Sequence, residues 1–164
     1  MLKTVGTLGC AGLLLAACTV VAVPVPGTPV PSGGLSTSLP PNFGSRNINA
    51  GFLPDPLAFS VISGGTVSGS GAFGCSGYFS AAPDFVVNYS AGGLPLTISA
   101  ISNADTTLIV RSPFQTHCSD DARGSLNPSV TINNPPSGSY YIWVGTYGSP
   151  STHPATLTIS ELGR

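Results

Sequence analysis

The stretch Gly138-Ser-Tyr-Tyr-Ile-Trp-Val-Gly-Thr-Tyr147 decides the fold. Its β-branched and aromatic residues favour an extended strand, in which successive side chains point to opposite faces. The alternation gives two groups, with Tyr140, Ile142 and Val144 on one face and Tyr141, Trp143 and Tyr147 on the other. Because both groups are apolar, the second group is either packed as core or forms an exposed aromatic strip that could bind a partner.

The rest of the second half of the chain repeats this pattern in shorter segments. Seven further strands are predicted near residues 57–62, 77–79, 84–89, 96–101, 106–111, 129–133 and 155–160. Turn signals such as Gly92-Gly93 separate them, and no convincing helical stripe occurs. About eight short strands predict an all-β domain, most economically a two-layer β-sandwich whose inner faces cover each other. A barrel is the alternative.

Composition narrows the classes of function. The 164 residues include only five Lys and Arg and six Asp and Glu, and the net charge is −1. Nucleic-acid binding needs a basic surface, so this class is excluded. The 21 Gly and 16 Pro suit tight turns between short strands, while the 41% hydrophobic content argues against a disordered chain.

The N-terminus has the form of a bacterial export signal. Lys3 is followed by Thr4–Ala17, an uncharged and apolar stretch that is too short to span a membrane. Leu15-Ala16-Ala17-Cys18 is similar to the lipobox of bacterial lipoproteins. This likeness implies a signal peptide over residues 1–17 and acylation of Cys18, which would make the membrane a partner of the chain.

The sorting of the exported chain has two possible outcomes. Thr19 after the lipobox cysteine resembles the outer-membrane sorting pattern, which implies an outer-membrane lipoprotein. Cleavage after Ala22 is the alternative, and it would release a soluble periplasmic or secreted protein. In either case residues 18–49, which are rich in Pro, Gly and Ser, are predicted to be an extended tether, and residues 50–164 the folded domain.

The cysteines agree with export. Cys10 leaves with the signal and Cys18 carries lipid, so Cys75 and Cys118 remain in an oxidising compartment. The two are predicted to form a disulfide. A metal site is the alternative, but neither residue has a Cys or His partner at the spacing that zinc sites use.

A family resemblance covers roughly residues 50–162. The residues that carry it are Gly51-Phe-Leu-Pro-Asp-Pro56, Cys75-Ser-Gly-Tyr78, Pro83-Asp84, Asp105-Thr-Thr-Leu108, Cys118-Ser-Asp-Asp121, Leu126-Asn-Pro128, Gly138–Tyr147 and Thr158-Ile-Ser-Glu161. The chain resembles the bacterial pre-peptidase C-terminal domains, with Ser119 where relatives often have an acidic residue. This implies a jelly-roll-like β-sandwich that serves as a non-catalytic accessory domain.

Catalytic motifs are absent from the sequence. A serine hydrolase needs a nucleophile in a tight turn, a His base and a carboxylate, yet no Gly-x-Ser-x-Gly occurs. The two histidines, His117 and His153, lie in polar segments. We therefore expect a non-catalytic cell-envelope lipoprotein that presents a binding, adhesion or accessory domain to an envelope protein or polysaccharide. The alternative is a secreted hydrolase, or an accessory subunit of a secreted serine-type peptidase.

Four oxygen-bearing residues form a candidate metal site. Asp105, Asp120, Asp121 and Asn127 could converge at one end of the sandwich, and Ca²⁺ prefers carboxylate and amide oxygens. Some relatives of the family bind Ca²⁺ at loop carboxylates, which supports Ca²⁺ as a cofactor by analogy. In the alternative interpretation these residues only initiate turns through hydrogen bonds to the backbone.

Overall fold

The computed structural model describes residues 34–163 of the chain. As the sequence predicts, this part is almost entirely β-structure. Its elements in chain order are β1 (Ser45–Asn49), β2 (Leu57–Gly64), β3 (Val67–Ser68), α1 (Gly69–Ala72), β4 (Tyr78–Phe79), β5 (Phe85–Ser90), β6 (Leu96–Ile101), β7 (Thr106–Arg111), β8 (Thr116–Ser119), β9 (Ser129–Ile132), β10 (Gly138–Thr146) and β11 (Thr152–Ser160). The predicted signal peptide, Cys18 and most of the Pro-rich stretch lie outside the described residues. Between residues 34 and 163, no helix has the length and hydropathy of a membrane span.

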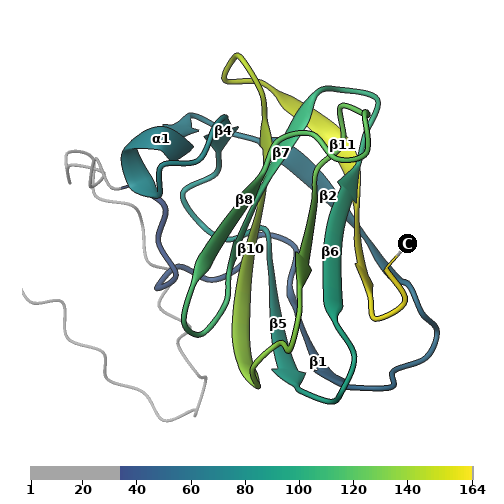
Figure 1. The fold of residues 1–164 in the computed structure, drawn as a ribbon. Helices are drawn as coiled ribbons and strands as arrows, with labels where there is room; N and C mark the ends of the chain where they lie inside the picture. Colours follow the sequence, from purple (N-terminus) through teal and green to yellow (C-terminus); the bar gives the residue numbers. More distant parts are fainter. Residues whose placement is uncertain (1–33, 164) are drawn as a thin grey trace, which may run out of the picture. The chain divides into compact units, whose positions relative to one another are not determined.

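The strands form two sheets (Figure 1). In the first sheet, β10 is central, with β5 on one side and β7 on the other; β1 lies beside β5 and β8 beside β7. Short strands β4 and β3 extend this sheet near the C-terminal end of β10. The second sheet has the order β2-β11-β6-β9. The predicted two-sheet β-sandwich is confirmed.

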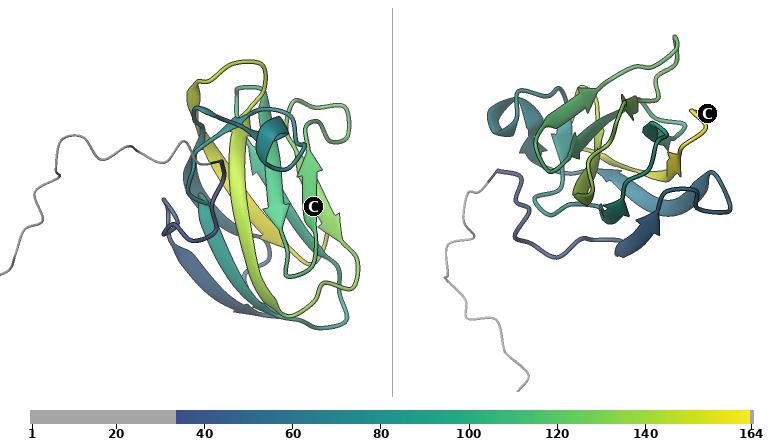
Figure 2. Two further views of the ribbon diagram at one scale, coloured as in Figure 1. Left: turned by 90° about the vertical axis from the view of Figure 1, so that its left-hand side faces the viewer. Right: turned by 60° about the horizontal axis from the view of Figure 1, so that its bottom comes forward.

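The main core lies between the two sheets. Figure 2 shows the two sheets from two further directions. Strand β10 illustrates how the core forms, because Tyr140, Ile142 and Val144 alternate along the strand and all three are fully buried. The same alternation buries the remaining core residues, which are Ile48, Val61, Phe85, Val87, Tyr89, Leu96, Ile98, Ala100, Leu108, Val110, Val130, Ile132, Ala155, Leu157 and Ile159. Each fully buried Leu, Ile or Val side chain contributes about 1.5 to 3 kcal/mol of transfer free energy.

A second, smaller apolar cluster covers the outer face of the first sheet. Trp143 and Ile109 belong to this face, and Phe79 and Cys75 pack with them. Phe73, between α1 and β4, lies with its ring centroid 5.9 Å from that of Trp143. Trp143 is therefore fully buried, so of the two alternatives for this face the structure shows core packing, and not an exposed strip, at this residue. The reason is that a segment far away in the sequence, residues 69–79, folds over the sheet.

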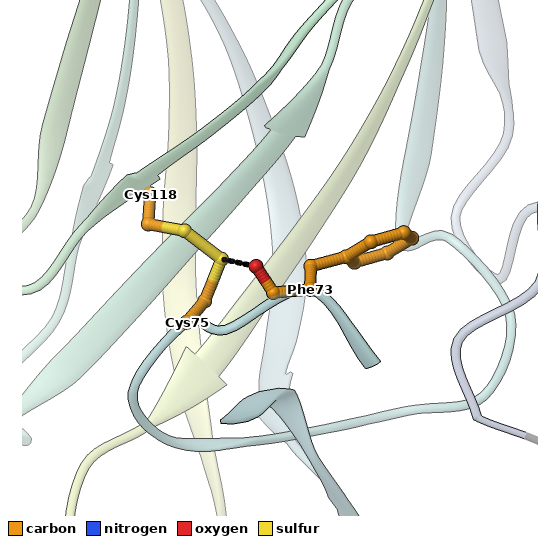
Figure 3. The surroundings of a disulfide bond; sticks show 3 residues. All are labelled: Phe73, Cys75 and Cys118. Atoms are coloured by element: carbon orange, nitrogen blue, oxygen red, sulfur yellow. Dashed lines mark hydrogen bonds between the residues drawn. A yellow bond between two sulfur atoms is a disulfide. The ribbon is translucent and has the colours of Figure 1, made fainter. Parts of the chain in front are cut away.

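The predicted disulfide between Cys75 and Cys118 is present (Figure 3). Its two Cα atoms are 5.6 Å apart, and 43 positions separate them in the sequence. Cys75 belongs to the segment that covers Trp143, whereas Cys118 lies in the edge strand β8. The bridge therefore ties the covering segment to the edge of the sheet that it covers.

The folded domain begins earlier than the sequence predicts. Residues Ser45–Asn49, assigned above to the tether, form β1 and pair in parallel with β5. Ile48 enters the main core, and Leu35 packs against the second cluster. The prediction of a tether as far as residue 49 is thus wrong for residues 35–49, because this polar segment is held by backbone pairing and a few apolar contacts.

The buried carboxylate of Asp84 binds a backbone N–H of β10 between the part of β10 that pairs with β5 and the part that pairs with β4. The Val144 N–H donates to Asp84 Oδ2 at 2.7 Å, and Asn42 Nδ2 and Ser80 Oγ donate to Oδ1 at 3.0 and 3.1 Å. Asp84 has no exposed surface. Burial raises the pKa of its carboxyl from 3.8 to about 6, and the three hydrogen bonds offset only part of this effect.

Candidate functional site

Three aspartates meet at one end of the sandwich. Asp105 directly precedes β7, and Asp120 and Asp121 directly follow β8. Since β7 and β8 are antiparallel neighbours, the start of one strand lies beside the end of the other. One carboxylate oxygen from each aspartate lies within 4.8 Å of the others. We call Asp105, Asp120 and Asp121 the acidic cluster.

The acidic cluster is electrostatically unfavourable on its own. Asp105 Oδ1 and Asp120 Oδ1 are buried and have no hydrogen-bond partner among the described residues. The pKa of Asp120 is raised by burial and, to a lesser extent, by the negative charges of Asp121 and Asp105. A buried charge without a partner costs free energy, and a cation would remove that cost. Convergent carboxylate oxygens are the ligands that Ca²⁺ prefers, so the three residues fit this ion.

Asn127, the fourth predicted metal ligand, is engaged elsewhere. Its Oδ1 accepts a hydrogen bond from the Ser102 N–H at 2.8 Å, and its backbone carbonyl accepts one from the Ala122 N–H at 3.1 Å. These bonds connect the loop after β8 to the end of β6. The structure therefore gives Asn127 a role in holding the loop, which is the turn-forming alternative that the sequence also allows.

Two exposed side chains, Tyr147 and Leu126, belong to segments that are joined by backbone hydrogen bonds to Asp105 of the acidic cluster or to its neighbour Thr106. The Tyr147 N–H donates to the carbonyl oxygen of Asp105 at 3.1 Å, and the Thr106 N–H donates to the carbonyl oxygen of Leu126 at 3.1 Å. Tyr147 is 50% exposed and Leu126 is 56% exposed. Of the predicted aromatic set, Trp143 is buried and Tyr141 packs against the second cluster, which leaves Tyr147 as the accessible member. Leu126 is missed by the sequence analysis, because an apolar residue in a polar loop carries no periodic signal.

His117 lies on the inner side of β8, opposite Val110 in the strand register. Its Nε2 atom is buried without a hydrogen-bond partner among the described residues, and burial lowers the pKa of the imidazole. The residue borders an open groove of about 410 Å³ between β8 and β9. Ser119 and Ser129 line the same groove, and Ser119 Oγ accepts a hydrogen bond from the Ser129 N–H at 3.0 Å.

The fold and the disulfide define a disulfide-bonded β-sandwich domain. Two solved structures are similar to this chain. The pre-peptidase C-terminal domain of collagenase from Bacillus anthracis has 14% identity and a TM-score of 0.41 over 71% of this chain and 94% of that chain. This is the family that the sequence resembles. Aeromonas hydrophila PliG, a periplasmic lysozyme inhibitor of g-type lysozyme, has 14% identity and a TM-score of 0.37 over 71% of this chain and 96% of that chain.

No family model matches the chain, and a search of curated proteins found no match.

Proposed function

We propose that this chain is a non-catalytic lipoprotein of the cell envelope, and that it binds an envelope protein or polysaccharide at the end of the sandwich that carries the acidic cluster. The acidic cluster is the observation that carries the proposal, since two of its oxygens are buried and find no hydrogen-bond partner in the described part of the chain. Backbone hydrogen bonds connect it to the segments that bear Tyr147 and Leu126. A bound Ca²⁺ would fix these segments in place and lower the ordering cost of binding.

Export and anchoring are the second part of the proposal. The lipobox-like Leu15–Cys18 supports acylation, and a disulfide between Cys75 and Cys118 is typical of a protein that folds outside the cytoplasm. We expect the wild-type chain to partition with envelope membranes and to yield an N-terminal peptide that begins with acylated Cys18. The Cys18→Ser chain should be released in soluble form. Mass spectrometry of the N-terminal peptide checks this, and an N-terminus at Val23 would support the alternative cleavage site.

Ca²⁺ should stabilise the domain. At a free Ca²⁺ concentration about 100 times its Kd, mass action raises the free energy of unfolding by about 2.7 kcal/mol, which corresponds to roughly 10 °C in Tm. Melting curves in Ca²⁺ and in chelator measure the difference. A Tm that is the same in both would contradict the cation site.

The Asp120→Asn variant gives two effects of opposite sign. In chelator it should melt higher than the wild type, because it removes the charge that Asp105 and Asp121 repel. In Ca²⁺ it should show a smaller increase in Tm, since one ligand oxygen has lost its charge. Asp55→Asn is a matched control: Asp55 Oδ2 accepts a hydrogen bond from the Glu161 N–H, and Asp55 is not in the acidic cluster. Its response to Ca²⁺ should equal that of the wild type.

Binding is tested with the exported Cys18→Ser chain against isolated cell-wall polysaccharide and detergent-solubilised envelope protein. We expect retention in Ca²⁺, and loss of retention in chelator or with Tyr147→Ala. Phe114→Ala is the matched control, because Phe114 is 87% exposed but lies in the β7–β8 turn, at the opposite end of those strands from the acidic cluster. Equal losses with the two alanine variants would contradict binding at the acidic end.

The absence of catalysis is tested with casein and a fluorophosphonate probe. We expect no cleavage and no labelling of the exported chain, in Ca²⁺ or in chelator. Ser119 and Ser129 border the groove next to His117, so their alanine variants are the informative ones. Labelling that disappears with one of these substitutions would favour the hydrolase alternative.

A further inference from the structure

Strand β2 presents an unpaired edge. It lies at one side of the second sheet, where β11 is its only strand partner among the described residues (Figure 1). None of the backbone hydrogen bonds found outside the strand ladders of residues 34–163 involves residues 57–64. Within residues 34–163, the side of β2 that faces away from β11 therefore offers backbone N–H and C=O groups without a partner. Such a row of groups is a template for a further strand.

The other four sheet edges carry features that discourage pairing, and the shortest of them, β3, has only two residues. Strand β1 has five residues and includes Arg46. Strand β8 has four residues and runs directly into Asp120 and Asp121. Strand β9 also has four residues and follows Pro128. Charge, proline and short length are the usual means by which proteins protect a sheet edge.

Strand β2 is the longest of the edge strands, although Asp55-Pro56 directly precedes it as Pro128 precedes β9. Its eight residues, Leu-Ala-Phe-Ser-Val-Ile-Ser-Gly, contain no charge and no proline. Ser63 at its C-terminal end is fully buried, so the accessible part of the edge is residues 57–62. Ile62 is 43% exposed. An uncharged edge of this length with an exposed apolar side chain is what an interface strand requires.

We propose that β2 is a homodimer interface, in which it pairs antiparallel with β2 of a second copy of this chain about a two-fold axis. The two four-stranded sheets would then form one continuous sheet. Strand addition of this kind takes its affinity from backbone hydrogen bonds and its specificity from the side chains on either side. The inference goes beyond the proposed function, and it requires neither the cation nor the binding partner.

The sequence of β2 is complementary to itself. Residues directly opposite each other in an antiparallel pair point to the same face of the sheet. The two-fold axis must therefore place one residue directly opposite its own copy in the second chain, and not opposite a sequence neighbour. An axis at Ser60 pairs Phe59 with Val61, and Ala58 with Ile62. No like charges and no proline meet in this register, whereas an axis at Phe59 would place Pro56 opposite Ile62. A second copy thus supplies the extended, uncharged and apolar partner that this edge fits.

The oligomeric state tests the proposal. The full chain, exported with Cys18→Ser so that no acyl group is attached, is analysed by sedimentation equilibrium at about 1 to 100 µM, the range in which a Kd in the micromolar range is resolved. We expect a monomer–dimer equilibrium. Ser60→Lys places two ammonium groups at the axis and should weaken the dimer at least tenfold. Thr156→Lys is the matched control, because Thr156 is exposed and lies opposite Ser60 on β11, one strand away from the interface.

A second variant keeps the test decisive if Ser60→Lys is poorly folded. Under mild oxidation Ser60→Cys should form a covalent dimer, whereas Thr156→Cys should remain monomeric. A wild-type chain that is monomeric throughout the range would overturn the proposal and leave the edge to a strand from a different protein. Equal dimerisation of Ser60→Lys and Thr156→Lys, or equal cross-linking of the two cysteine variants, would overturn it as well.

Discussion

Replacing Cys75 and Cys118 together by alanine should lower the free energy of unfolding by about 4 kcal/mol, which is the loop-entropy value for a bridge across 43 positions. The bridge also ties the covering segment to β8 above Trp143. Its loss therefore raises the conformational entropy of the unfolded chain. In the folded chain it also removes the covalent attachment of the covering segment to β8. Since a small domain is stable by only 5 to 15 kcal/mol, this loss is a large fraction of the total.

Urea denaturation followed by circular dichroism measures the effect. The wild type in a thiol reductant should approach the stability of the double variant, whereas the double variant should not respond to reductant. This comparison separates the covalent bond from the loss of the two sulfur atoms in packing. A double variant within about 1 kcal/mol of the wild type would show that backbone pairing and the apolar cluster alone hold the covering segment.

The second large effect concerns pH, and it arises at Asp84. The pKa of this carboxyl is about 6 in the folded chain and 3.8 in the unfolded chain. The folded state therefore binds the proton more tightly, so protonation of Asp84 favours folding. The contribution of Asp84 to stability is fully present below about pH 3.8 and is lost as the pH rises towards about 6. The difference amounts to about 3 kcal/mol.

The hydrogen bonds around Asp84 suit the protonated acid. The Ser80 hydroxyl lies 2.7 Å from the carbonyl oxygen of Ala82 and can donate its proton there. Ser80 Oγ can then accept the acid proton from Asp84 Oδ1, which lies 3.1 Å away. Asp84 Oδ2 continues to accept from the Val144 N–H. Every group in this network is then satisfied without a buried charge.

Asp84→Asn is the variant that checks this pH dependence. The amide supplies an oxygen for the Val144 N–H and a donor for Ser80, and it loses the hydrogen bond from Asn42 Nδ2 at every pH. We expect the wild type to lose stability relative to Asp84→Asn between pH 4 and 7, as measured by urea denaturation in chelator. The difference isolates Asp84 from the other carboxyl groups. Parallel pH profiles would contradict a raised pKa at this site.

Strand positions could be predicted because alternation is a local property of the sequence. The predicted strands at 96–101 and 106–111 have the same bounds as β6 and β7. Strand β1 could not be predicted from the same signal, since Ile48 is its only buried residue and its pairing with β5 is a long-range contact. Because β1 has no alternation of apolar residues, its sequence does not distinguish a paired strand from an extended tether.

The candidate site could be predicted in part for a similar reason. Asp105, Asp120 and Asp121 flank two neighbouring strands of one hairpin, so their meeting follows from local connectivity. The role of Asn127 could not be predicted, because an amide oxygen can bind either an ion or a backbone N–H. Only the three-dimensional contacts of the loop distinguish the two.

The burial of Trp143 has a practical consequence. It is the single tryptophan of the chain, and Phe73 and the bridged Cys75 lie in the segment that covers it. Its intrinsic fluorescence should therefore be that of an indole shielded from water, and it should shift to the red when the segment lifts away. One optical signal can thus report movement of the covering segment without any label.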